Sequence, residues 1–114
     1  MAPLPLFGMW YHPLYTDGIH PEARFPRDRY QRLLDRFETT GASQAMHITQ
    51  PQPVDPSLLL LAHDADYVDR FLAGELSDKE EKRIGLTPWT PAMIERTLVL
   101  MGGAVEATKH AVQT

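Results

Sequence analysis

The sequence predicts an α/β protein in which a short parallel sheet, formed by an N-terminal strand–helix–strand unit, packs with several helices. Two short apolar segments, Leu4–Trp10 and Ala45–Thr49, have the length and composition of strands. One amphipathic helical pattern, Asp28–Thr40, lies between them, and strands joined through a helix pair in parallel. Helical patterns also occupy most of the chain after residue 55. Together these observations predict a single domain over residues 1–114.

The first strand is expected to be buried, because its residues are almost all apolar or aromatic. A loop without regular structure is predicted over Tyr11–Arg27, where four residues interrupt helix and strand: Pro13, Gly18, Pro21 and Pro26. Its many polar and aromatic side chains leave two interpretations. It is either a functional loop or a surface loop whose aromatic residues pack locally.

The helix predicted over Asp28–Thr40 has an apolar face and is ended by Gly41. The apolar residues recur at positions i, i+3, i+4 and i+7: Tyr30, Leu33, Leu34 and Phe37. Pro51 and Pro53 limit the second strand that follows.

Two consecutive helices are predicted between Asp55 and Gly74. Asp55 and Pro56 are suited to the N-cap and first position of a short helix that runs to Ala62. The polar sequence His63-Asp64-Ala65-Asp66 then interrupts it, and Asp64 is suited to cap a second helix that Gly74 ends. One face of this second helix is apolar: Tyr67, Val68, Phe71 and Leu72.

Two further helices complete the chain. Ser77 and Glu80 have the spacing of a capping box, which begins a charged helix to about Arg83. After a turn-rich connection, Thr90-Pro91 begins a last helix over Ala92–Val112. Its expected packing stripe is Ile94, Leu98, Met101, Val105, Thr108 and Val112. The pair Gly102-Gly103 inside this helix indicates that another backbone comes close.

Composition excludes several classes of protein. With 43% hydrophobic and 23% charged residues the chain is expected to fold, and its net charge of −4 argues against nucleic-acid binding. It has no cysteine, which excludes disulfides and thiolate metal sites and is compatible with a reducing cytoplasm. No apolar segment is long enough to span a membrane, and the N-terminus lacks the basic region of a secretory signal. We therefore expect a cytoplasmic protein without nucleic-acid or membrane partners.

The residues by themselves predict no catalytic or metal site. None of the five histidines forms an H-x-x-x-H pair, and no G-x-S-x-G, G-x-G-x-x-G or P-loop motif is present. The densest polar cluster is His63 with Asp64 and Asp66, which helix capping and packing explain more simply than a metal ion does.

Several segments in order nevertheless resemble the N-terminal portion of the histone deacetylase superfamily, specifically its class IV-like bacterial deacetylases. The first loop carries Tyr11-His12-Pro13 and the RFP turn Arg24-Phe25-Pro26. Leu59–Val68 resembles the family's L-x-x-x-H-x-x-x-Y-V segment, and Arg83–Pro91 resembles its RIGLPW-x-P segment with Thr87 inserted. Gly102-Gly103 matches a glycine pair on the following helix, with Ala104 where the family usually has Thr.

The resemblance implies a partial arginase/deacetylase-like fold without its catalytic centre. The family's enzymes hydrolyse acyl amides of lysine or polyamines with a zinc ion held by two aspartates and a histidine. No residue of this chain corresponds to a zinc ligand or catalytic base, so no cofactor is expected in it. By analogy, six residues border the substrate channel: Tyr15, His20, Phe25, Pro26, Pro88 and Trp89. Five others belong to structural motifs: His63, Asp64, Tyr67, Gly102 and Gly103.

Three hypotheses about function follow. In the first, the chain is a truncated deacetylase homologue that is inactive alone and associates with itself, by sheet-edge pairing or by exchange of the last helix. In the second, it is the N-terminal part of a zinc-dependent acyl-lysine or acetylpolyamine deacetylase, active only when a complementary C-terminal chain completes it. In the third, it is a non-enzymatic interaction module.

Overall fold

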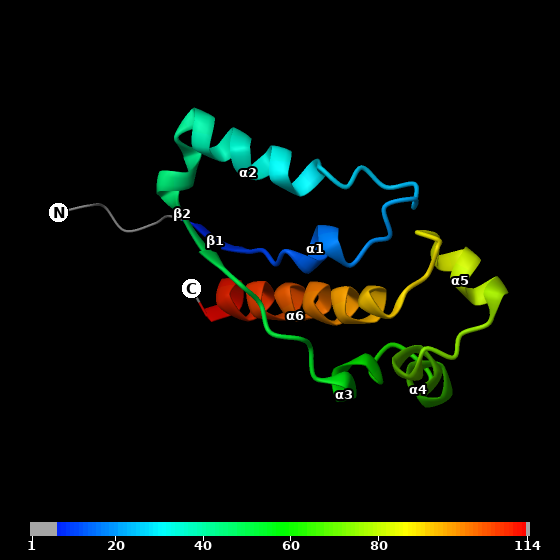
Figure 1. The fold of residues 1–114 in the computed structure, drawn as a ribbon. Coiled ribbons are helices and arrows are strands. Elements are labelled where there is room, and N and C mark those ends of the chain that lie inside the picture. Colours follow the sequence, from blue (N-terminus) through cyan, green and yellow to red (C-terminus); the bar gives the residue numbers. More distant parts are fainter. Residues whose placement is uncertain (1–6, 114) are drawn as a thin grey trace.

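The computed structural model describes residues 7–113, so Leu4–Leu6 of the predicted first strand lie outside the described residues. The elements are those labelled in Figure 1, together with a short 3-10 turn, η1. In chain order they are β1 (Phe7–Trp10), α1 (Leu14–Asp17), α2 (Arg29–Thr40), η1 (Ala42–Ala45), β2 (Met46–Thr49), α3 (Pro56–Leu59), α4 (Ala65–Ala73), α5 (Asp78–Ile84) and α6 (Pro91–Gln113). The protein is a small, mostly helical α/β-like domain.

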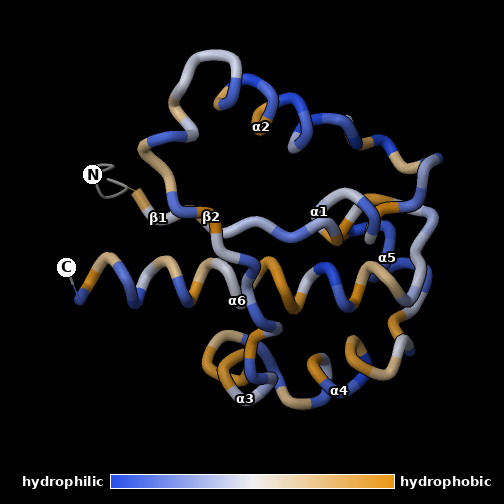
Figure 2. The backbone as a smooth tube through the Cα atoms, turned by 60° about the vertical axis from the view of Figure 1, so that its left-hand side comes forward, coloured by the Kyte–Doolittle hydropathy of each residue, from blue (hydrophilic) through white to orange (hydrophobic). Residues whose placement is uncertain are grey.

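The predicted parallel pair is confirmed. β1 and β2 form a two-stranded parallel sheet in which Phe7 aligns with Met46 and Trp10 with Thr49. The Trp10 ring meets the His110 ring of α6 at a centroid distance of 5.6 Å, so α6 covers the face on which Trp10 lies. α2 lies on the other side of the strands (Figures 1 and 2).

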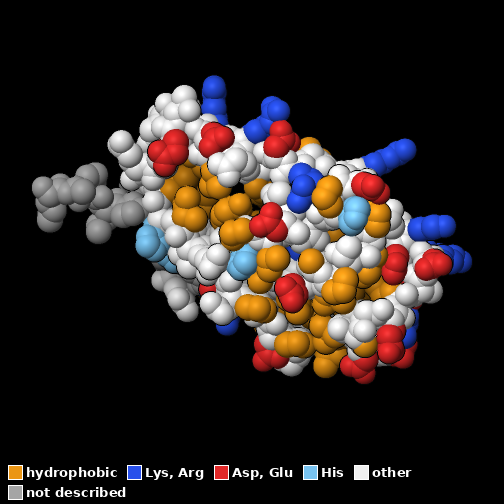
Figure 3. Space-filling view, viewed as in Figure 1, with side chains coloured by type: hydrophobic (Ala, Val, Ile, Leu, Met, Phe, Trp, Pro, Cys, Tyr) orange, Lys and Arg blue, Asp and Glu red, His pale blue; other side chains and the backbone are white. Residues whose placement is uncertain are grey.

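The prediction that the first strand is buried is wrong. Phe7 is 57% exposed, and Ile48 on the neighbouring strand is 44% exposed. The helix α2 is confirmed, and Gly41 ends it in the left-handed conformation at φ 80°, but no residue of α2 is buried. The sheet face turned toward α2 and the apolar face of α2 therefore both remain partly exposed. Figure 3 shows hydrophobic side chains at this place.

The predicted loop over residues 11–27 contains a helical turn, α1. Pro13 adopts helical dihedral angles at its N-cap, and the His12 Nδ1 accepts a hydrogen bond from the backbone N–H of Leu14 at 3.0 Å. Proline is compatible with the start of a helix, which explains why its presence did not exclude one here. The short helix expected to reach Ala62 ends at Leu59 as α3.

The caps of the middle helices follow the predictions. Asp55 accepts a hydrogen bond from the backbone N–H of Ser57, and Ser77 with Glu80 forms the reciprocal capping box of α5. Gly74 ends α4 at φ 73°. Asp64 occupies the N-cap position of α4, although its side chain makes no capping hydrogen bond.

The packing stripe of α6 differs from the predicted one. The buried residues are Met93, Arg96, Val99, Gly102 and Gly103. On the predicted stripe, Met101 is 42% exposed and Val112 is 80% exposed. The two glycines lie on the inward face, where the segment after β2 packs closely against them.

The last helix is also the longest. Within residues 7–113, no helix combines the length and apolar character needed to cross a membrane.

Candidate functional site

The first loop is held by the buried ring of Tyr15. Tyr15 lies on α1 and is 6% exposed. Its ring centroid is 5.7 Å from that of Tyr11 and 5.4 Å from that of Tyr30 on α2. Burial, together with the proximity of Tyr30 and Glu106, raises the pKa of Tyr15 above its ordinary value, while Arg96 partly opposes this. The hydroxyl therefore stays protonated at neutral pH.

A buried arginine of α6 joins this loop to the helix. Arg96 is 6% exposed and its Nε donates a hydrogen bond to the backbone carbonyl oxygen of Tyr15 at 2.8 Å. Its guanidinium carbon also lies 5.5 Å from the centroid of the Phe25 ring, within the range of a cation–π contact. The sequence pattern did not predict a role for Arg96. Its signal was a charged residue three positions after Met93 and three before Val99, on what proves to be the inward face of α6.

The two loops predicted to border a substrate channel meet on one hydrophobic cluster. The cluster consists of Ile19, Ala23 and Met93, and Phe25 of the first loop and Trp89 of the later loop both pack against it. Ile19 and Met93 are each 1% exposed. The later loop turns at Gly85 and Leu86, both of which have positive φ.

The other predicted channel residues lie less centrally. His20 is half-buried, and its Nδ1 accepts a hydrogen bond from the backbone N–H of Glu22 at 3.1 Å. Pro26 and Pro88 are exposed. The structure thus packs Phe25 and Trp89 against the same cluster, and Arg96 contacts both Tyr15 and Phe25. The hydrogen bond of His20 is a local one to Glu22.

A small apolar pocket lies beside Trp89, between α6 and the helices α3 to α5. Its volume is about 220 Å³. His63 and Tyr67 line the pocket, with their ring centroids 5.6 Å apart. Phe71 packs edge to face against Trp89, with a centroid distance of 5.9 Å. The full lining is Leu59, His63, Tyr67, Val68, Phe71, Ile84, Trp89, Thr97 and Met101.

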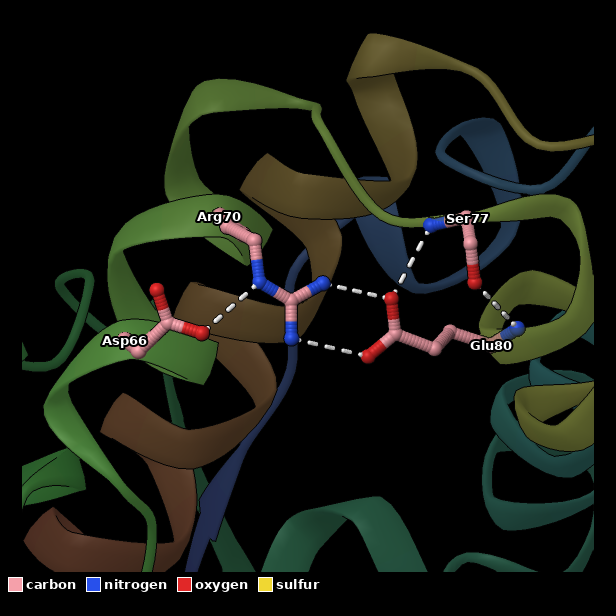
Figure 4. A network of polar contacts seen from close by, with 4 residues as sticks. All are labelled: Asp66, Arg70, Ser77 and Glu80. Atoms are coloured by element: carbon pink, nitrogen blue, oxygen red, sulfur yellow. Dashed lines mark hydrogen bonds and ion pairs between the residues drawn. The ribbon is translucent and has the colours of Figure 1, made fainter.

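An ion-pair network fastens α4 to α5 (Figure 4). The Nε of Arg70 donates to Asp66 at 3.0 Å, and its two terminal nitrogens donate to the two carboxylate oxygens of Glu80. The hydrogen bonds from Arg70, and then that from the backbone N–H of Ser77, lower the pKa of Glu80 to about 2. The carboxylates of Glu80 and Asp66 raise the pKa of Arg70. Asp66, part of the polar cluster noted in the sequence, is thus an ion-pair partner.

The two glycines of α6 allow a close approach, as predicted. A Cβ atom on Gly102 would lie 1.8 Å from the carbonyl oxygen of Gln52. A Cβ atom on Gly103 would lie 2.7 Å from the hydroxyl oxygen of Tyr15. Gly103 therefore also belongs to the packing of the first loop.

The residues described here do not fit a zinc site. Within residues 7–113, no group of three His, Asp or Glu side chains lies close enough together to hold a metal ion. The zinc chemistry that the resemblance implies has no ligand set in this part of the molecule.

Comparison with known proteins gives one relative of greater length. No protein-family model matches the chain. A protein of the cyanobacterium Picosynechococcus sp., itself uncharacterized, is 36% identical over 107 residues. The match covers 94% of this chain and 35% of the relative, so the chain spans about a third of the length of the relative that it matches.

Proposed function

We propose that this chain corresponds to the N-terminal scaffold of a class IV-like member of the histone deacetylase superfamily, with a partial arginase/deacetylase-like fold. In this proposal it supplies the wall beside a substrate channel, does not hydrolyse amides by itself and associates with further copies of itself. The proposal rests on the ordered motifs of the sequence, and two structural observations support it.

The packing of Phe25 and Trp89 on one hydrophobic cluster is the structural observation that carries the proposal. The resemblance implies that the two loops that contain them border the same substrate channel, although 64 positions separate the residues in the sequence. Both side chains pack on the cluster of Ile19, Ala23 and Met93. A common wall requires such proximity, and two unrelated loops would not need it.

The buried contacts behind this wall explain how it would be kept in place. Arg96 fixes the backbone of Tyr15 and lies against the Phe25 ring. Preorganised walls orient a substrate without spending binding energy on loop ordering. The residues described here would therefore position an acyl chain, and zinc, when bound by ligands from elsewhere in a complete enzyme, would polarise its carbonyl group.

The second candidate, an enzyme part that a C-terminal part completes, is favoured by the length of the Picosynechococcus relative, about two thirds of which lies outside the match. The partly open faces of the sheet and of α2 support it, because parallel sheets are normally covered on both faces.

The test uses the full-length Picosynechococcus relative and a chimera in which this chain replaces the matched third. If the proposal is right, both bind zinc in a one-to-one ratio and release acetate from an acetyl-lysine peptide in a manner that a chelator stops. A relative that folds but neither binds zinc nor deacylates would overturn the assignment to this superfamily. A chimera carrying Trp89→Ala should bind zinc equally while losing affinity for the peptide.

A further inference from the structure

Two surfaces of opposite charge lie on opposite sides of the molecule. The first, the arginine surface, covers residues 24–40 and comprises α2 and the segment before it, with five arginines and three carboxylates. The second, the acidic corner, covers residues 55–75 and comprises α3 and α4, with five carboxylates and one arginine. α6 lies between them in both views of the chain (Figures 1 and 2). A single copy therefore cannot bring these surfaces together.

The excess charge of each surface is not neutralised within the described residues. On the arginine surface, Arg32 pairs with Asp28, but Arg24 and Arg36 are exposed and form no ion pair within residues 7–113. On the acidic corner, Asp66 is paired with Arg70, whereas Asp69 and Glu75 are exposed and form no ion pair in the same range. Figure 3 shows Lys and Arg side chains projecting above α2 and Asp and Glu side chains along the edge near α3 and α4.

Each surface also carries apolar side chains that remain uncovered. Leu33 on α2 is 47% exposed. On the acidic corner, Leu60 is 50% exposed and Leu61 is 85% exposed. Exposed apolar groups rimmed by charge are typical of interaction surfaces. Each surface thus carries at least one exposed leucine, and the net charges of the two surfaces are opposite.

We propose that the acidic corner of one copy docks on the arginine surface of a second copy. This inference rests on the self-association in the proposed function and names the surfaces that carry it. The two surfaces differ, so the contact is heterologous and leaves one of each kind free at the ends of a dimer. Further copies can add, and the assembly grows with concentration. Opposite charges set the register and speed the encounter, so salt weakens it.

Charge-reversal variants in sedimentation velocity test the proposal on the whole chain. The first variant combines Arg24→Glu with Arg36→Glu, and the second combines Asp69→Lys with Glu75→Lys. The first variant makes both surfaces negative and the second cancels the net charge of the acidic corner, so each association constant should fall about tenfold or more. Mixed in equal amounts, the two variants should associate again, because the unchanged acidic corner of the first variant meets the unchanged arginine surface of the second. Lys82→Glu with Arg83→Glu on α5 changes the net charge as much as the first variant does and should leave association within about twofold.

The outcomes separate this inference from the proposed function. If both variants associate as the wild type does and a mixture adds nothing, the inference is overturned, while self-association through another surface, such as the sheet edge, stands. If the wild type is monomeric at every concentration, the inference and the self-association in the proposed function both fall, while the superfamily assignment is decided by the zinc and deacylation test. If circular dichroism shows that a variant does not fold, the salt dependence of wild-type association still tests the inference. The wild-type association constant should drop as ionic strength rises from about 0.05 M to about 0.5 M, and an unchanged constant would overturn the inference.

Discussion

Arg96 and Tyr15 are 81 positions apart, and the Nε of Arg96 donates a hydrogen bond to the backbone carbonyl oxygen of Tyr15 at 2.8 Å. Arg96 is a buried charged residue within residues 7–113, and the same guanidinium lies against the ring of Phe25. One side chain of α6 therefore holds both the helical turn and the RFP turn of the first loop. The position of that loop depends on it.

Replacing Arg96 by methionine should lower the free energy of unfolding by about 1–3 kcal/mol, because the carbonyl oxygen of Tyr15 loses its hydrogen bond inside the protein. Urea titration followed by circular dichroism measures this. The matched control is Arg36→Met on the exposed side of α2, which should change the free energy by no more than about 0.5 kcal/mol. Equal losses in both variants would contradict the role assigned to Arg96.

Replacing Gly102 by alanine should also destabilise the fold, although alanine favours a helix by about 1 kcal/mol over glycine. The new Cβ atom would lie 1.8 Å from the backbone carbonyl oxygen of Gln52, so two backbone segments must separate. Such overpacking costs about 1–3 kcal/mol or more. Thermal unfolding compares this variant with Gly103→Ala, in which the obstructing atom belongs to the side chain of Tyr15 and the loss should be smaller. A higher melting temperature for Gly102→Ala would show that the close approach is not present.

The two methionines of α6 should differ in their contribution to stability. Met93 is 1% exposed in the cluster beneath Phe25 and Trp89, whereas Met101 is 42% exposed. Met93→Ala should therefore cost about 2–5 kcal/mol, as buried large-to-small changes do, and should shift the fluorescence of Trp89 in a Trp10→Phe background. Met101→Ala is the control and should cost much less. The packing stripe predicted from the sequence contains Met101 and not Met93, so the reverse order would favour that stripe.

The contact between Arg70 and Glu80 should make stability depend on acid. The arginine holds the pKa of Glu80 at about 2, below the ordinary value of 4.5, so the folded state favours the ionised carboxylate. This contribution is fully present above about pH 4.5 and disappears as the pH falls through about 2. In Glu80→Gln it is absent, so the variant should lose less stability than the wild type between pH 5 and pH 2. Urea titrations at several pH values test this, with Glu38→Gln as the control for removing one carboxylate elsewhere.

Local signals in the sequence predicted the elements well. The caps at Asp55, Ser77 and Gly74 depend on neighbouring residues alone, and the structure has all of them. The parallel pairing of the two strands followed from the helix between them. The glycine pair in α6 predicted a close approach, but only the three-dimensional arrangement shows that Gln52 and Tyr15 make it.

The sequence could not show which faces are buried. Residues 11–27 read as an open loop because prolines interrupt them, yet Tyr15 and Ile19 are among the most buried side chains. Periodicity assigned α6 a stripe of large apolar residues. The inward face instead carries Met93, Arg96, Val99 and the two glycines. The glycines lie where the backbone of Gln52 and the side chain of Tyr15 come close. The predicted burial of β1 fails at Phe7 and Gly8, which are exposed.

The central claim is that this chain provides a scaffold and channel wall without a zinc centre. The most direct measurement is the zinc content and acetyl-lysine hydrolysis of the purified chain after incubation with zinc and removal of the excess. We predict substoichiometric zinc and no turnover above the rate of the buffer. One tightly bound zinc ion per chain, with turnover that a chelator abolishes and added zinc restores, would contradict the claim.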